Sequence, residues 1–313
     1  PVLRDRPQDK PFFLWLAAFD PHRPYAANIV EKPHTAADVV LPPFLPDTPK
    51  IRDELAQYYD EIHRLDQYLG RVLDELDRQK VSQNTLILFI SDNGRPFPRC
   101  KTTLYDSGIR TPMLARWPDR VRPGSVCDSL VSAVDIAPTF LELAGLTPGP
   151  TFQGHSFAKL FSDPTATIRD YAFAEHNWHD FDDHQRAVRG LRYLYIENNY
   201  TDIPLTPPSD AVRSDTFREM RRLHANGNLT PVQQQPFLKP RPNEELYDTA
   251  ADPFQLKNLA TDRAHAEALR GLRQALATWK TATGDAVPNK RRPDEFHRDT
   301  GERLTAKPKA GAK

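Results

Sequence analysis

Three hydrophobic patterns divide the chain and predict its main elements. Residues 11–19 and 85–90 are continuous apolar runs, which is typical of strands buried on both faces of a sheet. Between them, residues 51–76 carry apolar side chains at alternating steps of four and three, which predicts one long amphipathic helix. A strand, a helix and a second strand in this order predict an α/β layer with a mostly parallel sheet.

The second half of the chain has shorter apolar segments. A strand is predicted over residues 112–117, and a helix begins near Asp135 and ends at Gly145. After about residue 165, short strand candidates followed by one helix predict a small antiparallel sheet unit. The strand candidates are residues 171–174, 187–189, 193–196 and 246–247, and the helix covers residues 264–281.

These patterns predict two domains and a tail. The main α/β domain covers residues 1–164, and the small antiparallel subdomain covers residues 165–286. Within the subdomain, residues 200–242 are polar and rich in proline, which favours a long surface loop. Residues 287–313 are rich in Lys and Arg and are expected to form a flexible tail. Because a buried strand so near the start leaves a sheet edge unprotected, we expect further sequence upstream.

Composition narrows the choice of partners. The 42 Lys and Arg residues balance the 42 Asp and Glu residues, so no net field attracts a nucleic acid or an anionic membrane. No run of about 18 apolar residues predicts a membrane helix. The two cysteines, Cys100 and Cys127, leave one disulfide or none open. We therefore expect no nucleic-acid partner and no membrane span, and nothing in the sequence sets the oligomeric state.

Two oxygen-bearing side chains follow the second predicted strand. Asp92 and Asn93 come directly after residues 85–90 and before Gly94, and they offer a carboxylate and an amide oxygen to a hard cation. An Asp-Asn-Gly sequence is also a common turn, which is the alternative interpretation. Ligand sites of α/β sheets lie at the carboxyl ends of strands, and this position favours a metal site.

Two other side chains can act on an anion. His22 follows residues 11–19 in a proline-rich loop, and an imidazole there can donate a proton near neutral pH. Lys101 can bind an anionic oxygen as a compact charge. A structural histidine and a solvated surface lysine are the alternatives, because both are more frequent than catalytic ones.

Five segments in this order resemble blocks of the type I sulfatases, the formylglycine-dependent enzymes of the alkaline-phosphatase superfamily. One such segment is common, whereas all five in order are specific. They are Phe12-Phe13-Leu14 through Asp20-Pro21-His22-Arg23-Pro24-Tyr25, Asn84-Thr85 through Ser91-Asp92-Asn93-Gly94, Lys101 through Pro112, Asp135-Ile136-Ala137-Pro138-Thr139, and Glu245-Leu246-Tyr247-Asp248 with Asp252-Pro253 and Asn258-Leu259.

The resemblance implies an alkaline-phosphatase-like α/β sandwich, with a large mostly parallel sheet and a small carboxy-terminal subdomain, that hydrolyses a sulfate ester or sulfamate. It implies that Asp92 and Asn93 ligate calcium, that Lys101 contacts the sulfate and that His22 assists the leaving atom. The family's nucleophile is a formylglycine made from Cys or Ser in a Cys/Ser-x-Pro-x-Arg motif. That motif does not occur in these residues, and Cys100 lacks its context, so the resemblance implies a fragment without the nucleophile.

Two details resemble the heparan N-sulfatase branch of the family. They are the short spacer between Asp92 and Lys101 and the segment covering residues 175–180. The branch implies a sulfated sugar or glycosaminoglycan as substrate, and a periplasmic, secreted or lysosomal location. A lysine at position 101, where that branch has arginine, leaves O-sulfate and N-sulfate linkages both open. The expected substrate contacts are Arg23, Arg99, His176 and His179.

Three alternatives remain open from the sequence. His176 and His179 can be surface residues or form a hydrogen-bonded cluster within the subdomain. The protein can be a phosphodiesterase or phosphonate hydrolase of the same superfamily, although those sites need more His and Asp ligands for two transition metals. It can also be a sulfosugar-binding protein without catalysis.

Overall fold

The computed structural model describes residues 2–304, and every structural statement below concerns that range. The chain forms two compact units that alternate along the sequence. Unit 1 contains Pro1–Leu41, Asp47–Phe89 and Leu114–Pro123, and unit 2 contains Pro42–Pro46, Ile90–Met113 and Gly124–Lys313. These units describe compactness, so the domain boundary predicted at residue 164 stays a prediction.

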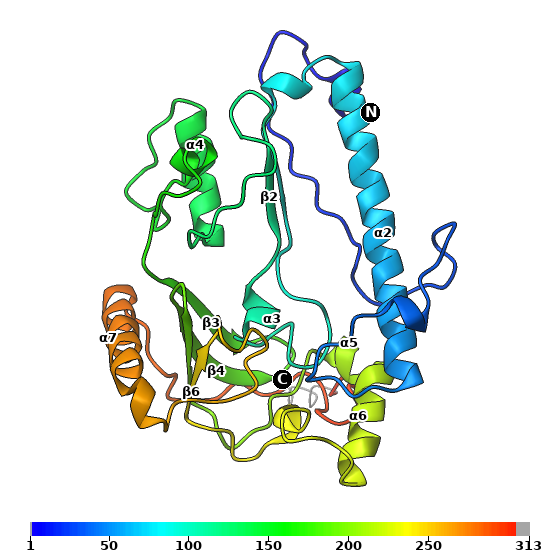
Figure 1. Cartoon of the computed structure of the whole chain (residues 1–313), viewed down its shortest axis with the longest axis vertical. Helices are drawn as coiled ribbons and strands as arrows, with labels where there is room; N and C mark the ends of the chain where they lie inside the picture. The colour runs from blue at the N-terminus through cyan, green and yellow to red at the C-terminus, as the bar shows by residue number, and fades with distance from the viewer. Residues whose placement is uncertain (1, 305–313) are drawn as a thin grey trace, which may run out of the picture. The chain divides into compact units, whose positions relative to one another are not determined.

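Unit 1 is built around the long helix α2, Pro49–Arg78, which Figure 1 shows in cyan and blue. Pro49 occupies the first helical position, where its missing N–H costs no hydrogen bond. The helix buries Ile51, Leu55 and Leu76, as the stripe of apolar residues predicts. Three short elements complete its surroundings: α1 (Val2–Asp5), η1 (Ala36–Asp38) and η2 (Ser82–Asn84).

The predicted strand over residues 11–19 is wrong. The segment forms no strand within residues 2–304, and four of its large side chains are at least 60% exposed: Phe13, Trp15, Leu16 and Phe19. A strand exists only when its N–H and C=O groups pair with a neighbour, and no segment of the described chain pairs with this one. The apolar side chains of residues 11–19 favour burial, but no other segment of residues 2–304 pairs with this one to form the sheet that would bury them.

Two later strand predictions are confirmed in position. The strands β1 (Ile87–Ile90) and β2 (Met113–Arg116) pair in a two-stranded sheet. The expectation that residues 85–90 are buried on both faces is wrong, since Ile90 is 40% exposed. Two strands cover too little surface to bury each other's side chains.

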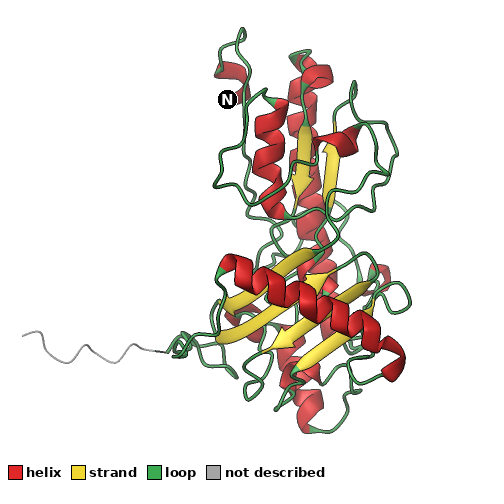
Figure 2. Ribbon diagram, turned by 90° about the vertical axis from the view of Figure 1, so that its left-hand side faces the viewer, coloured by secondary structure: helices red, strands yellow, loops and turns green. Residues whose placement is uncertain are grey.

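Unit 2 contains an antiparallel sheet, as the sequence predicts, and its strand order is β3-β4-β5-β6. Alternation of side chains gives the sheet two apolar faces. Val188, Tyr195 and Leu246 pack against the helix α7, Ala266–Thr283, which crosses the sheet in Figure 2. The strands are β3 (Ala172–Trp178), β4 (Asp182–Arg189), β5 (Tyr193–Asn198) and β6 (Glu244–Asp248).

The opposite face of the sheet packs on the segment that follows β1. Ala187, Leu194, Ile196 and Tyr247 form one cluster with Leu104, Tyr105 and Leu205. Unit 2 also contains α3 (Asp106–Ile109), η3 (Ala133–Asp135), α4 (Ile136–Leu143), η4 (Ala158–Phe161) and η6 (Arg263–His265).

The segment of residues 200–242 is not the surface loop that its composition predicts. It contains α5 (Ser209–Val212), α6 (Asp215–Ala225) and η5 (Gln235–Phe237), and it buries Phe217 and Met220 completely or nearly so. The prediction failed because these apolar residues lie one helical turn apart among many charged ones. Ser214 caps α6 by accepting a hydrogen bond from the Phe217 N–H.

Part of the predicted tail is ordered against unit 2. Phe296 and Arg303 form an antiparallel bridge, and the Arg298 guanidinium donates to the Asp182 carbonyl at 2.8 Å. Residues 305–313 lie outside the described range. Cys100 and Cys127 are both free thiols. Across residues 2–304, no helix combines the length and apolar character needed to cross a membrane.

Candidate functional site

The turn after β1 presents Asp92 and Asn93 on a tightly held backbone. The Asp92 Oδ1 accepts a hydrogen bond from the Asn93 N–H at 2.9 Å, and the Asp92 side chain is exposed. The Gly94 N–H donates to the Gly108 carbonyl at 2.9 Å. A Cβ at position 94 would lie 1.9 Å from the Ser107 carbonyl oxygen, so only glycine allows this approach. The turn is therefore clamped against α3.

Lys101 lies on the same loop. Its N–H donates to the Arg95 carbonyl at 3.1 Å, which closes the loop between them. The residues on either side of Cys100-Lys101, Arg99 and Thr102, both have φ +64°, a left-handed conformation that turns the chain sharply. The structure thus brings Asp92, Asn93 and Lys101 onto one closed loop of unit 2.

Arg99, expected to contact substrate, instead faces the interior of unit 2. The residue is 1% exposed. Its guanidinium donates to the Gln235 side chain, to the Phe254 carbonyl at 3.0 Å and to the Gln255 carbonyl. Its Cζ also lies 3.8 Å from the centre of the Tyr105 ring. We therefore propose that Arg99 positions the loop, because its donors are directed at the protein.

Two further contacts attach this loop to the antiparallel sheet. Arg189 of β4 forms a bidentate ion pair with Asp106, with N···O distances of 2.9 and 3.1 Å. The Tyr105 hydroxyl donates to the Glu245 carboxylate of β6 at 2.8 Å, and burial raises the Tyr105 pKa far above its usual range. Sequence reasoning missed these partners and those of Arg99, because nothing local links Arg99 to a carbonyl 155 residues away.

His22 and Arg23 lie in unit 1, so their convergence with Lys101 stays a prediction. The exposed His22 ring places its Nδ1 2.6 Å from the Arg23 carbonyl. A carbonyl can only accept, so Nδ1 carries the proton and Nε2 is the free nitrogen. Arg23 is 8% exposed and pairs with Glu54, with its guanidinium over the Tyr25 ring at 4.6 Å. The charge of Arg23 is therefore paired with a carboxylate of unit 1.

A neighbouring ion pair steadies the same loop of unit 1. Asp20 accepts two hydrogen bonds from the Arg64 guanidinium, both at 2.6 Å. These bonds, opposed by burial, lower the pKa of Asp20. The backbone before His22 is thereby tied to α2.

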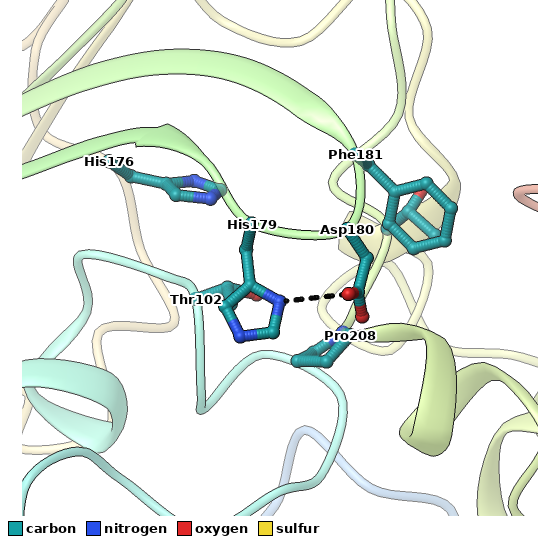
Figure 3. Close-up of a pocket in the computed structure, with 7 residues that line it drawn as sticks. Thr102, His176, His179, Asp180, Phe181 and Pro208 are labelled. Carbon is teal, nitrogen blue, oxygen red and sulfur yellow. Dashed lines mark ion pairs between the residues drawn. The ribbon is translucent and has the colours of Figure 1, made fainter. Parts of the chain in front are cut away.

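His176 and His179 line a small pocket of unit 2 that Figure 3 shows. His176 is on β3 and His179 is in the turn before β4. The β3–β4 register shifts between His176 and Trp178, and such an irregularity changes the direction of nearby side chains. Sequence reasoning found the two histidines but missed five other lining residues: Thr102, Asp180, Phe181, Thr206 and Pro208.

The charges around this pocket are well defined. Burial would raise the pKa of Asp180, but hydrogen bonds from His179 and Ser209 outweigh it and hold the pKa at about 2. The His179 Nδ1 lies 3.4 Å from the Asp180 Oδ1. Burial lowers the pKa of His176, against the opposing effect of the Asp183 charge. At neutral pH the pocket therefore contains a carboxylate and an uncharged His176 ring.

The loop supplies only part of a metal site. Within residues 2–304, no group of three or more His, Cys, Asp and Glu side chains is arranged to hold a metal ion. Asp92 and Asn93 contribute two hard oxygen donors, the kind that calcium binds, out of about six to eight that it needs. Cys100 is buried and its pKa is raised by that burial, which disfavours the reactive thiolate.

Comparison with known proteins places these features in a family. Residues 1–146 match the family described as Sulfatase, and residues 99–235 match the family described as N-sulphoglucosamine sulphohydrolase, C-terminal. The two matched ranges together include every expected site residue.

Named relatives agree with these matches. An ulvan-active sulfatase of Formosa agariphila is 37% identical over 247 residues, which cover 78% of this chain and 41% of the relative. Human N-sulphoglucosamine sulphohydrolase is 30% identical over 311 residues, with 88% of this chain and 62% of the relative covered. The chain thus spans less than two thirds of the length of either relative.

A solved structure from glycosaminoglycan metabolism in Bacteroides thetaiotaomicron has a TM-score of 0.63 at 24% identity, and the match covers 86% of this chain and 55% of that one. This likeness confirms the predicted alkaline-phosphatase-like α/β class. From the ordered motifs, the clamped loop and these matches, the chain belongs to the type I sulfatase family of the alkaline-phosphatase superfamily.

Proposed function

We propose that the protein acts as a sulfatase that hydrolyses a sulfate ester or sulfamate of a sulfated sugar. The observation that carries this proposal is the closed loop of unit 2, which holds Asp92, Asn93 and Lys101 together. A rigid backbone keeps charged groups in place before substrate arrives, which is how such sites stabilise developing charge.

Lys101 is proposed to bind a sulfate oxygen. Its ammonium is a compact charge at the end of a flexible stem, and the stem begins on a backbone fixed by the Arg95 and Arg99 turns. Asp92 and Asn93 would hold calcium, with further ligands from elsewhere. A calcium ion bound there would add positive charge beside the sulfate.

His22 is proposed to protonate the leaving atom. The protonated ring can give its proton from Nε2, because Nδ1–H is held by the Arg23 carbonyl. The neutral ring left behind is the tautomer that this carbonyl already stabilises. The histidine thus returns to its resting state without a change of hydrogen bonds.

The nucleophile and the substrate complete the proposal. The family's formylglycine motif does not occur in the 313 residues, so we propose that the nucleophile is supplied outside them. The similarity to an ulvan-active sulfatase and to N-sulphoglucosamine sulphohydrolase favours a sulfated glucosamine or another sulfated polysaccharide unit as substrate. We further propose an exported or lysosomal location, as expected for enzymes acting on such sugars.

The test measures binding of inorganic sulfate to the 313-residue chain by isothermal titration in the presence of calcium. Replacing one charged ligand costs roughly 1.5–3 kcal/mol, so Lys101→Ala should weaken binding by about 10- to 100-fold. The control Arg120→Ala removes an exposed charge of unit 1 and should leave the affinity unchanged. Equal affinity of the wild type and Lys101→Ala would contradict the proposal.

A further inference from the structure

The pocket on the β3–β4 turn has room for one small group. Its volume is about 10 Å³, which is the space of a single water-sized group. Figure 3 shows the His176 and His179 rings, the Asp180 carboxylate and Thr102 around it. Thr102 directly follows Lys101, so the pocket and the proposed sulfate contact belong to one loop.

His176 is poorly satisfied in this structure. Both of its ring nitrogens are buried, and neither meets hydrogen-bond geometry within residues 2–304. Gln185, opposite it on β4, interacts with the ring but also keeps a buried Oε1 without a hydrogen bond. The nearest carboxylate, that of Asp183, lies 3.8 Å from Nδ1, which is too far for a hydrogen bond. Native proteins rarely leave both nitrogens of a buried imidazole unsatisfied, so a ligand group is expected there.

The electrostatic surroundings keep the His176 ring neutral. Asp183 is buried, and its Oδ1 accepts from the buried Arg241 guanidinium at 2.7 Å, so its charge is matched. Burial lowers the pKa of His176, which disfavours the charged form of its ring. A neutral imidazole has one N–H donor and one lone-pair acceptor. The best partner is a group that can both donate and accept.

We propose that this pocket receives one hydroxyl group of the substrate sugar and that His176 determines this specificity. The inference rests on the proposed sulfatase function. A hydroxyl matches the volume and offers both a donor and an acceptor to the ring. An ammonium only donates. A second sulfate only accepts, is larger than the pocket, and would meet the ionised Asp180.

Other contacts of the pocket agree with a hydroxyl. The Thr102 hydroxyl donates to the Lys101 carbonyl at 2.6 Å, which leaves its oxygen lone pairs available as acceptors. Phe181 and Pro208 supply apolar surface for the C–H face of a sugar ring. The pocket therefore favours a sugar with a free hydroxyl near its sulfate over one that carries a second sulfate there.

The experiment uses the 313-residue chain, calcium, a glucose monosulfate and analogues that each lack one ring hydroxyl. Binding is followed by NMR through the ring signals of His176 and His179. One analogue should bind the wild type roughly 5- to 100-fold more weakly than the parent, because it leaves the imidazole unpaired. In His176→Leu that analogue and the parent should bind equally, and the matched control His155→Leu, at an exposed site, should behave as wild type.

A second variant separates lost chemistry from lost structure. His176→Gln keeps one donor and one acceptor, so it should retain part of the discrimination that His176→Leu loses. Urea unfolding of both variants checks that the sheet is intact.

Each outcome has one meaning. If all analogues bind as tightly as the parent while sulfate binding is intact, the hydroxyl-binding role of the pocket is refuted and the pocket holds only a water. The sulfatase proposal is unaffected by that result. A hydroxyl response at His176 that is indifferent to both sulfate and Lys101→Ala overturns the sulfatase proposal instead. Binding of a disulfated glucose as tight as that of the parent also refutes the pocket.

Discussion

Replacement of Arg99 by methionine should destabilise unit 2 strongly. Arg99 is 1% exposed, and the variant removes its hydrogen bonds to the Gln235 side chain and to the carbonyls of Phe254 and Gln255. It also removes the cation–π contact with Tyr105 at 3.8 Å. Methionine has a similar length, so the effect comes mainly from lost polar contacts and not from a cavity.

The expected magnitude follows from those contacts. An acceptor left unsatisfied inside a protein costs about 1–3 kcal/mol, and a desolvated cation–π contact adds about 2 kcal/mol. Removing the cation also removes its desolvation cost, which offsets part of this sum. We expect a net loss of about 3–5 kcal/mol in the free energy of unfolding. Since m is about 1–3 kcal/mol/M in urea for small proteins, the midpoint should fall by roughly 1–5 M.

The assay is urea unfolding followed by far-UV circular dichroism and by amide hydrogen exchange of β4 and β5. The matched control is Arg110→Met, an exposed arginine eleven positions along the chain, with an expected change of less than about 0.5 kcal/mol. Arg99→Lys keeps the charge but not the three-way geometry, so its stability should be intermediate. If Arg99→Met unfolds within about 0.5 kcal/mol of the wild type, the positioning role is refuted.

Three further outcomes are expected. Gly94→Ala should weaken sulfate binding by about 10-fold or more, because its Cβ would lie 1.9 Å from the Ser107 carbonyl, whereas Gly70→Ala, with open space around it, should not. Burial lowers the pKa of His176 and His184 below their ordinary 6.5, so the unfolded chain binds more protons in that window. The free energy of unfolding is thus highest above about pH 6.5 and decreases on acidification. In thermal melts, His176→Gln and His184→Gln should lose less stability on acidification than the wild type. An equal loss in the variants and the wild type would refute the role of these histidines. Finally, the 313-residue chain with calcium should turn over neither a chromogenic sulfate ester nor sulfamated glucosamine, and metal-dependent turnover would require a different nucleophile.

Sequence patterns predicted the elements whose backbone hydrogen bonds are made within one segment or between neighbouring segments. The stripe over residues 51–76 predicts α2 because a helix completes its hydrogen bonds within one segment. Three strands of the antiparallel sheet, β3, β4 and β5, were predictable because they follow one another closely in sequence, whereas β6 comes only after the segment of residues 200–242. Residues 11–19 were not, since a strand depends on neighbours that its own sequence does not specify.

The candidate site shows the same division. Asp92, Asn93 and Lys101 were recognisable from ordered motifs, and the structure places all three on one loop. The partners of Arg99 could not be predicted, because Gln235, Phe254 and Gln255 lie 136 to 156 positions further along the chain. The matched charges of Asp183 and Arg241 were also invisible, as they are 58 positions apart in the chain.

The attachment of the loop to the antiparallel sheet limits how this family can recombine. Residues from Arg99 to Asp106 are joined to β4, β6 and the 254–255 turn through Arg189, Glu245 and Gln255. A chimera that exchanged the carboxy-terminal subdomain between two sulfatases would therefore also replace the supports of the loop that carries Lys101. Such an exchange can transfer a new sugar preference only if the loop and its supports are inherited together.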